Sequence, residues 1–199
     1  MAIGTMNSMF PAFALLVALP LAGCGGPSEP PPLAGAKIGG PFTLTDGNGK
    51  TVRDTDFTGK YRIVYFGYTY CPDVCPTDMQ KIGQAMRILD KDAPKVSEQV
   101  VPFFITVDPE RDTPAKVKEF TAAFHPRIVG LTGSVLAITA VAKEYAVYFK
   151  KQKPAPGGGY MVDHLAVAFL MGPKGEPVAA LPIDKDGPAI AEQVRHWVR

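Results

Sequence analysis

The chain has 199 residues, 46% of them hydrophobic, and a formal net charge of +2 at pH 7. This length and composition suit one compact domain with its own apolar core. The near-neutral charge, with no basic stripe and no known binding motif, argues against a nucleic-acid partner. Three cysteines in a chain of this length also argue against a fold built on structural disulfides.

The amino-terminal segment has the features of an export signal. Its first 23 residues contain no Lys, Arg, Asp or Glu, and residues 11–21 are an apolar stretch too short for a stable membrane-spanning helix. The stretch ends in Leu21-Ala-Gly-Cys24, which resembles the lipobox of bacterial lipoproteins, where cleavage precedes a lipid-carrying cysteine. We therefore predict a signal peptide over residues 1–23 and a lipid on Cys24, at the periplasmic side of a bacterial membrane. The alternative, an uncleaved hydrophobic anchor with Cys24 unmodified, places the domain on the same side.

Residues 24–40 are predicted to hold the lipid anchor and a Pro/Gly-rich tether, because glycine loosens a chain and a proline run extends it. Residues 41–199 are predicted to form the folded domain. It opens with a β-hairpin, in which residues 42–45 and 49–52 flank the turn Asp46-Gly-Asn-Gly49.

Two buried strands with a helix between them follow the hairpin. Residues 61–66 and 100–107 are apolar with little alternation, as in strands covered on both faces. Between them, residues 77–89 place Met79 and Met86 at helical spacing. These methionines are therefore expected in the core rather than at a metal.

The rest of the chain alternates helices and strands. A βαβ unit followed by an antiparallel hairpin and a terminal helix is the thioredoxin pattern. We therefore predict an α/β, thioredoxin-like fold, with a central mixed sheet flanked by helices and an N-terminal β-hairpin. The remaining predicted elements are a helix from the Thr113 cap to about Phe124, a strand over 128–131, a helix from the Ser134 cap to Tyr145, a surface loop over 150–159, a hairpin of 165–171 and 177–181, and a helix over 188–198.

Cys71 and Cys75 mark the candidate site. They form the motif Cys71-Pro-Asp-Val-Cys75-Pro76, where a buried strand leads into a helix. The helix dipole and the unpaired N–H groups of the first helical turn favour thiolate over thiol there. Two such sulfurs can cycle between dithiol and disulfide, or they can hold a soft metal such as Cu(I). The spacing is one residue longer than the usual redox C-x-x-C, which weakens the case for an ordinary thioredoxin role.

His164 shifts the interpretation toward a metal. It precedes the predicted strand 165–171, and in a thioredoxin fold the turn before this strand lies beside the cysteine loop. Redox thioredoxins place a cis-proline there, whereas this chain has Asp163-His164. Two thiolates and an imidazole suit Cu(I) and can also take Cu(II), and Asp163 is expected to accept the other ring N–H. The other histidines, His125 and His196, are expected to be structural.

Three motifs together resemble the Sco/SenC family of copper proteins. The resemblance implies a thioredoxin-like domain anchored outside the cytoplasmic membrane. The lipoprotein-type N-terminus departs from the transmembrane anchor of many relatives, which changes the tether and leaves the site unaffected. The motifs lie in the family's order within about residues 33–199 and are Cys71–Pro76, Val107–Pro114 and Val162–His164.

The same resemblance implies a copper metallochaperone in which Cys71, Cys75 and His164 bind Cu(I) or Cu(II). The implied partner is subunit II of cytochrome c oxidase, whose Cu-A centre the family helps to assemble and whose cysteine pair it is credited with reducing. A second periplasmic copper chaperone, or a thiol reductant, is a further expected partner. Asp73 matches the family motif, and residues 108–113 match a family loop expected to organise the rim of the site.

Two further hypotheses use the same thiols. An extracytoplasmic thiol–disulfide oxidoreductase would need a reversible bond between Cys71 and Cys75, with turnover independent of His164. A thiol peroxidase or redox sensor would need one low-pKa nucleophile and a resolving thiol, but no neighbouring motif for polarising a peroxide is evident. The chaperone hypothesis is preferred, and whether the protein is also an enzyme is left open.

Overall fold

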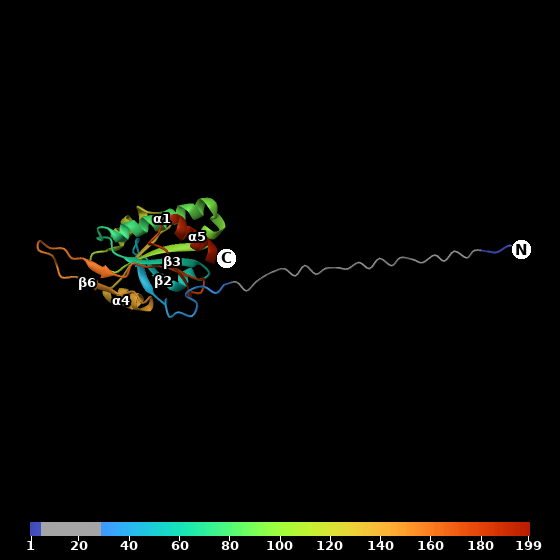
Figure 1. Ribbon diagram of the computed structural model, residues 1–199. Coiled ribbons are helices and arrows are strands. Elements are labelled where there is room, and N and C mark those ends of the chain that lie inside the picture. Colours follow the sequence, from blue (N-terminus) through green and yellow to red (C-terminus); the bar gives the residue numbers. More distant parts are fainter. Residues whose placement is uncertain (5–28) are drawn as a thin grey trace.

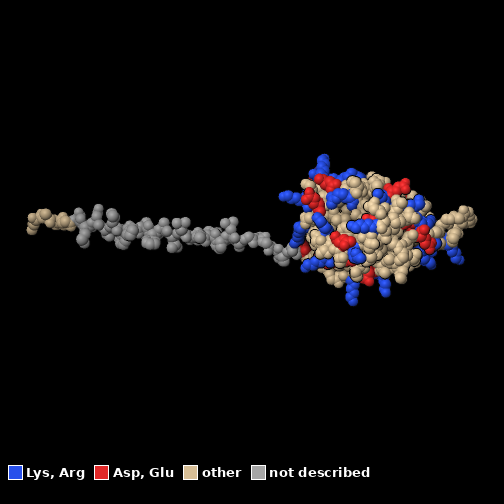
Figure 2. Space-filling view, turned by 180° about the vertical axis from the view of Figure 1, so that it is seen from behind, with Lys and Arg blue, Asp and Glu red and all other residues tan. Residues whose placement is uncertain are grey.

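The computed structural model describes residues 1–4 and 29–199. Most of the predicted signal peptide, the first part of the tether and the predicted lipidation site Cys24 lie outside the described residues. Within the described part of the chain, no helix is both long and apolar enough to cross a bilayer. Lys and Arg side chains are interspersed with Asp and Glu over the face shown in Figure 2.

Seven strands form the central sheet, in the order β2-β1-β5-β4-β3-β8-β9. Strands β3, β4 and β5 are parallel to one another, and the remaining neighbours are antiparallel, so the predicted mixed sheet and its N-terminal hairpin are confirmed. The strands are β1 Thr43–Asp46, β2 Thr51–Arg53, β3 Tyr61–Gly67, β4 Val100–Thr106, β5 Val129–Thr132, β8 Ala168–Met171 and β9 Pro177–Leu181.

Helices cover both faces of this sheet, with α1 and α5 on one side and α4 on the other (Figure 1). The end of α3 lies against α1, because Arg87 Nη1 donates to the Phe124 carbonyl at 2.5 Å. The predicted caps are confirmed: the side chains of Thr113 and Ser134 accept from the backbone three residues later. The helices are the 3-10 turn η1 Asp54–Phe57, α1 Val74–Asp92, α2 Pro94–Ser97, α3 Pro114–Ala122, α4 Val135–Glu144 and α5 Gly187–Trp197.

The segment around His164 differs from the prediction. The strand expected from Leu165 begins only at Ala168, and His164 instead ends a separate strand, β7 Val162–His164. This strand pairs with β6 Phe149–Lys151, so the predicted loop is partly a strand. A three-residue alternation of buried, exposed and half-buried side chains is too short to be recognised as a strand in sequence. The hairpin and its loop project from one end of the domain (Figure 1).

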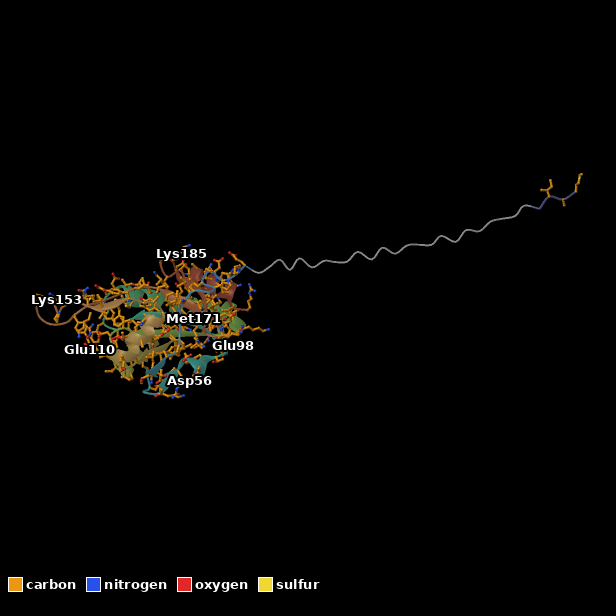
Figure 3. The ribbon with its side chains drawn as sticks, turned by 90° about the horizontal axis from the view of Figure 1, so that it is seen from below. Asp56, Glu98, Glu110, Lys153, Met171 and Lys185 are labelled. Carbon is orange, nitrogen blue, oxygen red and sulfur yellow. The ribbon has the colours of Figure 1, made fainter. Side chains whose placement is uncertain are left out.

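The chain enters the domain at the opposite end. Residues 29–35 line a pocket with Tyr61, the first residue of β3, and with Trp197. Part of the segment expected to be tether is bonded to the domain, since the Leu33 amide donates to the Val178 carbonyl at 3.0 Å. Figure 3 shows the two ends of the molecule, with Glu110 and Lys153 at one and Glu98, which precedes β4, toward the other.

The predicted helix core is confirmed. The side chains of Met79 and Met86 on α1 have no solvent exposure, as expected for core residues. Helix α1 begins three residues earlier than predicted, at Val74, so Cys75 lies inside its first turn. The strand β3, buried along almost its whole length, therefore delivers the chain directly to the candidate site.

Candidate functional site

The two cysteines occupy the junction between β3 and α1. Cys71 lies in the connecting turn and is half-buried, whereas Cys75 is fully buried; neither thiol is in a disulfide. Gly67, the last residue of β3, faces Cys75, and a Cβ there would come within 3.1 Å of Cys75 Sγ. Glycine at the end of the strand therefore leaves room for this thiol, which a side chain would crowd.

His164 contacts the buried thiol, with its Nε2 atom 3.2 Å from Cys75 Sγ. Its Nδ1 atom lies 3.3 Å from the Leu165 carbonyl, which can only accept, so Nδ1 carries the proton and the Nε2 lone pair faces the sulfur. Burial lowers the pKa of His164, which keeps the ring neutral at pH 7. The rings of Tyr65 and Tyr68 pack edge-to-face on the imidazole and fix its plane.

The two thiols have different acidities. Burial opposes ionisation of Cys71, but the backbone N–H groups of Cys75 and Asp73 lower the pKa of the Cys71 thiol below its usual value. One of these contacts is the Cys75 amide, 3.4 Å from Cys71 Sγ. Burial raises the pKa of Cys75, and the neighbouring Cys71 sulfur raises it further. Cys71 is therefore the more acidic thiol of the pair, and Cys75 holds its proton more tightly.

The two aspartates expected to support the site act differently from each other. Asp73 occupies the cap position of α1, but its side chain makes no capping hydrogen bond, and it supports Cys71 through its backbone N–H. Asp163 is exposed and accepts from the Gln152 amide. Neighbouring residues of a strand point to opposite sides, so Leu165, not Asp163, fixes the tautomer of His164.

The Tyr68 hydroxyl links the cysteine turn to the histidine strand. This buried hydroxyl lies 3.8 Å from Met161 Sδ, and it lowers the pKa of the Cys71 thiol, while the Val162 backbone lowers the pKa of Tyr68 itself against the effect of burial. Sequence reasoning missed both Tyr68 and Met161. Tyr68 belongs to an apolar run, and Met161 to a loop, so neither carried a local signal.

The loop predicted to organise the rim does so through Asp112 and Asp108. Asp112 is fully buried and accepts from the backbone and hydroxyl of Thr69, at 2.9 and 2.6 Å, and from the hydroxyl of Thr106 at 2.6 Å. It thereby ties the end of β4 to the turn that carries Cys71. Burial raises the pKa of Asp112, and these hydrogen bonds oppose that effect because they stabilise the carboxylate.

A cluster of Asp108, Arg111 and Tyr160, which we call the clamp, joins this loop to the projecting hairpin. The Tyr160 hydroxyl donates to Asp108 Oδ1 at 2.7 Å, and Arg111 Nε donates to Asp108 Oδ2 at 2.5 Å. The guanidinium of Arg111 lies 3.7 Å from the centre of the Tyr160 ring and 4.7 Å from that of Tyr70. The clamp therefore holds the segment that carries His164 against the segment that carries Cys71.

The remaining histidines lie outside the site. His125 is buried with its Nε2 atom 3.0 Å from Asp90, and the His196 ring packs edge-to-face on Trp197 at 4.5 Å. Both positions agree with the structural roles predicted for them. Within residues 1–4 and 29–199, no group of three Cys, His, Asp or Glu side chains is already arranged to hold a metal ion. At the site itself, the contact already formed is the one between Cys75 and His164.

A sequence model of the SCO1/SenC family matches residues 31–199 of the chain. The chain belongs to this family. It is 44% identical over 146 residues to the mitochondrial protein SCO1 homolog 1 of Arabidopsis thaliana, an alignment that covers 73% of this chain and 42% of that protein. It is 39% identical to the mitochondrial protein SCO2 of Saccharomyces cerevisiae, covering 81% of this chain and 53% of that protein. The chain thus spans about half the length of these curated relatives.

Solved structures confirm the thioredoxin-like fold. The structure of Bradyrhizobium japonicum ScoI with copper bound superposes with a TM-score of 0.73 at 41% identity, covering 80% of this chain and 99% of that one. The thioredoxin domain of a thiol-disulfide oxidoreductase from Bacteroides vulgatus superposes with a TM-score of 0.57 at 17% identity, covering 81% and 96%. This second likeness concerns the fold alone.

Proposed function

We propose that this SCO1/SenC protein is a membrane-anchored copper metallochaperone that assists assembly of the Cu-A centre in subunit II of cytochrome c oxidase. The observation that carries the proposal is the contact of 3.2 Å between Cys75 Sγ and His164 Nε2, at the same helix end as Cys71. The copper bound to the similar ScoI of B. japonicum supports it.

The donor atoms fit copper. Two sulfurs and one imidazole nitrogen are soft and borderline ligands, which suit Cu(I) and tolerate Cu(II). The Cys71 sulfur is already the more acidic of the two, and the unprotonated Nε2 of His164 faces the second sulfur. Copper binding would displace the proton of Cys75, so uptake should release protons.

The segment by which the described chain enters the domain and the proposed site lie at opposite ends of the domain. Residues 29–35 lie beside Tyr61 at the start of β3, whereas Cys71 follows the end of that strand at Gly67. A strand of this length separates its two ends by about 20 Å. A lipid on Cys24, at the periplasmic side of a bacterial membrane, would therefore leave the copper site facing away from the attachment point. Replacing Cys24 by Ala should release the protein or block its processing.

Competitive titration tests the copper site. Reduced protein is titrated anaerobically with Cu(I) against a chelator, for the wild type, for His164→Ala and for the matched control His196→Ala. We expect one copper per chain, an affinity at least tenfold lower for His164→Ala, and no change for His196→Ala, whose ring packs on Trp197. Binding that is indifferent to His164 would refute the site.

A second activity, reduction of the target's disulfide before metal transfer, is favoured by the unequal acidities of the two thiols. The Cys71 thiolate attacks one sulfur of the target disulfide, forms a mixed disulfide and expels the other sulfur as a thiolate. Cys75 passes its proton to His164 Nε2 and attacks Cys71 Sγ, which releases the second target thiolate and leaves Cys71 and Cys75 bonded to each other. Two electrons pass to the target, and a periplasmic thiol reductant must restore the pair.

Single-turnover reduction of a disulfide-bonded peptide separates this activity from copper binding. In copper-free protein, Cys71→Ser should abolish the mixed disulfide, whereas Cys75→Ser should trap it. A Cys71→Ser protein that still reduces the peptide would exclude this mechanism and leave the copper proposal standing.

A further inference from the structure

Met161 is an exposed soft ligand beside the proposed copper site. Its side chain is 47% exposed, whereas the side chains of Met79, Met86 and Met171 have no exposure and fill the core. A single exposed apolar side chain is ordinary, but a thioether that solvent can reach beside a proposed Cu(I) site is available to the metal as a soft ligand.

The thioether lies close to the outer thiol. Met161 Sδ is 3.8 Å from the Tyr68 hydroxyl, and the same hydroxyl acts on the Cys71 thiol, whose pKa it lowers. Both sulfurs therefore neighbour the same Tyr68 hydroxyl. Met161 also precedes His164 by three residues, on the same arm of the projecting hairpin. Its three side-chain torsions allow the sulfur to swing toward Cys71 without movement of the backbone.

The soft ligands form a gradient of burial. Met161 is exposed, Cys71 and His164 are half-buried, and Cys75 is fully buried. A thioether binds Cu(I) without having to lose a proton, whereas Cys75 must lose one. Cu(I) arriving from solvent or from a partner therefore meets Met161 first and the tightest ligands last.

Resting on the proposed copper function, we propose that Met161 is a transient ligand through which Cu(I) enters and leaves the site. The thioether takes Cu(I) from the donor, Cys71 joins it, and Cys75 and His164 then replace the thioether. The Cys75 proton leaves as its sulfur binds. Release follows the reverse order, and the metal keeps its oxidation state throughout.

Stopped-flow exchange of Cu(I) with a small chelator tests this role in reduced full-length protein. Met161→Leu keeps the size and apolar character of the side chain and removes only the sulfur. Tyr148→Leu is the matched control, because Tyr148 is also exposed, at 64%, and borders the same hairpin but has no sulfur. We expect Met161→Leu to slow both loading and release at least fivefold with a Kd changed less than threefold, since a transient ligand lowers the barrier in both directions. Tyr148→Leu should exchange at the wild-type rate.

Three results would overturn the inference. Wild-type exchange rates in Met161→Leu would show that the sulfur takes no part. Equal slowing in Tyr148→Leu would assign the effect to the apolar surface. A tenfold loss of equilibrium affinity in Met161→Leu would make the thioether a permanent ligand. Each of these leaves the proposed function intact if His164→Ala still weakens binding, whereas a wild-type protein that does not bind Cu(I) would defeat both proposals.

Discussion

The clamp offers a quantitative test of how the site is assembled. The hairpin of β6 and β7 pairs only with itself, and a two-stranded hairpin has little stability of its own. The contacts of Tyr160 with Asp108 and Arg111 are therefore expected to keep His164 beside the cysteines. Two substitutions separate these contacts, because Tyr160→Phe removes the hydroxyl and Tyr160→Leu removes the aromatic ring as well.

The expected magnitudes follow from the geometry. Asp108 is only 3% exposed, and the Tyr160 hydroxyl donates to it at 2.7 Å. Losing a hydrogen bond to a charged group costs about 1.5 to 3 kcal/mol, and the partial exposure of Tyr160 favours the lower end, about 1.5 kcal/mol. Loss of the ring over Arg111 adds about 1 kcal/mol. Tyr160→Phe should thus cost about 1.5 kcal/mol and Tyr160→Leu about 2.5 kcal/mol.

Urea unfolding of the reduced, copper-free protein measures these costs, and Cu(I) titration measures their effect on the site. A loosened hairpin lowers the fraction of molecules in which His164 is in place, and the apparent Kd rises in proportion. We expect copper affinity to fall in the order wild type, Tyr160→Phe, Tyr160→Leu. The control is Tyr148→Phe, because Tyr148 borders the same hairpin but is 64% exposed. If Tyr160→Leu matches this control in both stability and affinity, the clamp does not hold the site together.

Two further predictions concern titrating groups. In reduced, copper-free protein, iodoacetamide should modify Cys71 before Cys75, because the pKa of Cys71 is lowered and that of Cys75 is raised. The reaction of Cys71 should begin at a lower pH than that of an ordinary free thiol. Peptide mass spectrometry measures the modification of each cysteine, and equal modification of the two would contradict the prediction. Burial lowers the pKa of His125 despite Asp90, so the unfolded chain takes up a proton that the folded chain does not. Stability should therefore fall as the pH drops below about 6.5, and the urea midpoint of His125→Gln should vary less between pH 6.5 and 5 than that of the wild type.

Local features of the chain were sufficient for most of the fold. The buried strand β3, the caps Thr113 and Ser134 and the core face of α1 follow from runs, periodicity and capping chemistry within a few residues of one another. The cysteine motif and His164 could be recognised for the same reason, because their residue types and the apolar runs next to them can be read from a few neighbouring residues.

Contacts between distant segments required the tertiary structure. Cys75 and His164 are 89 residues apart in sequence, and tertiary packing, with the imidazole against the rings of Tyr65 and Tyr68, brings their side chains to 3.2 Å. The choice of Leu165 over Asp163 as the partner of the imidazole depends on which way a three-residue strand faces.

The sequence by itself determined the class of fold and the order of the strands and long helices around the central sheet, and it predicted the ligand types, because each depends on neighbours along the chain. The tertiary structure alone decided which thiol is buried, how Arg111 joins two loops, and that Met161 lies beside Tyr68. These outcomes depend on burial and on side-chain direction, which are properties of the packed molecule that no local pattern encodes.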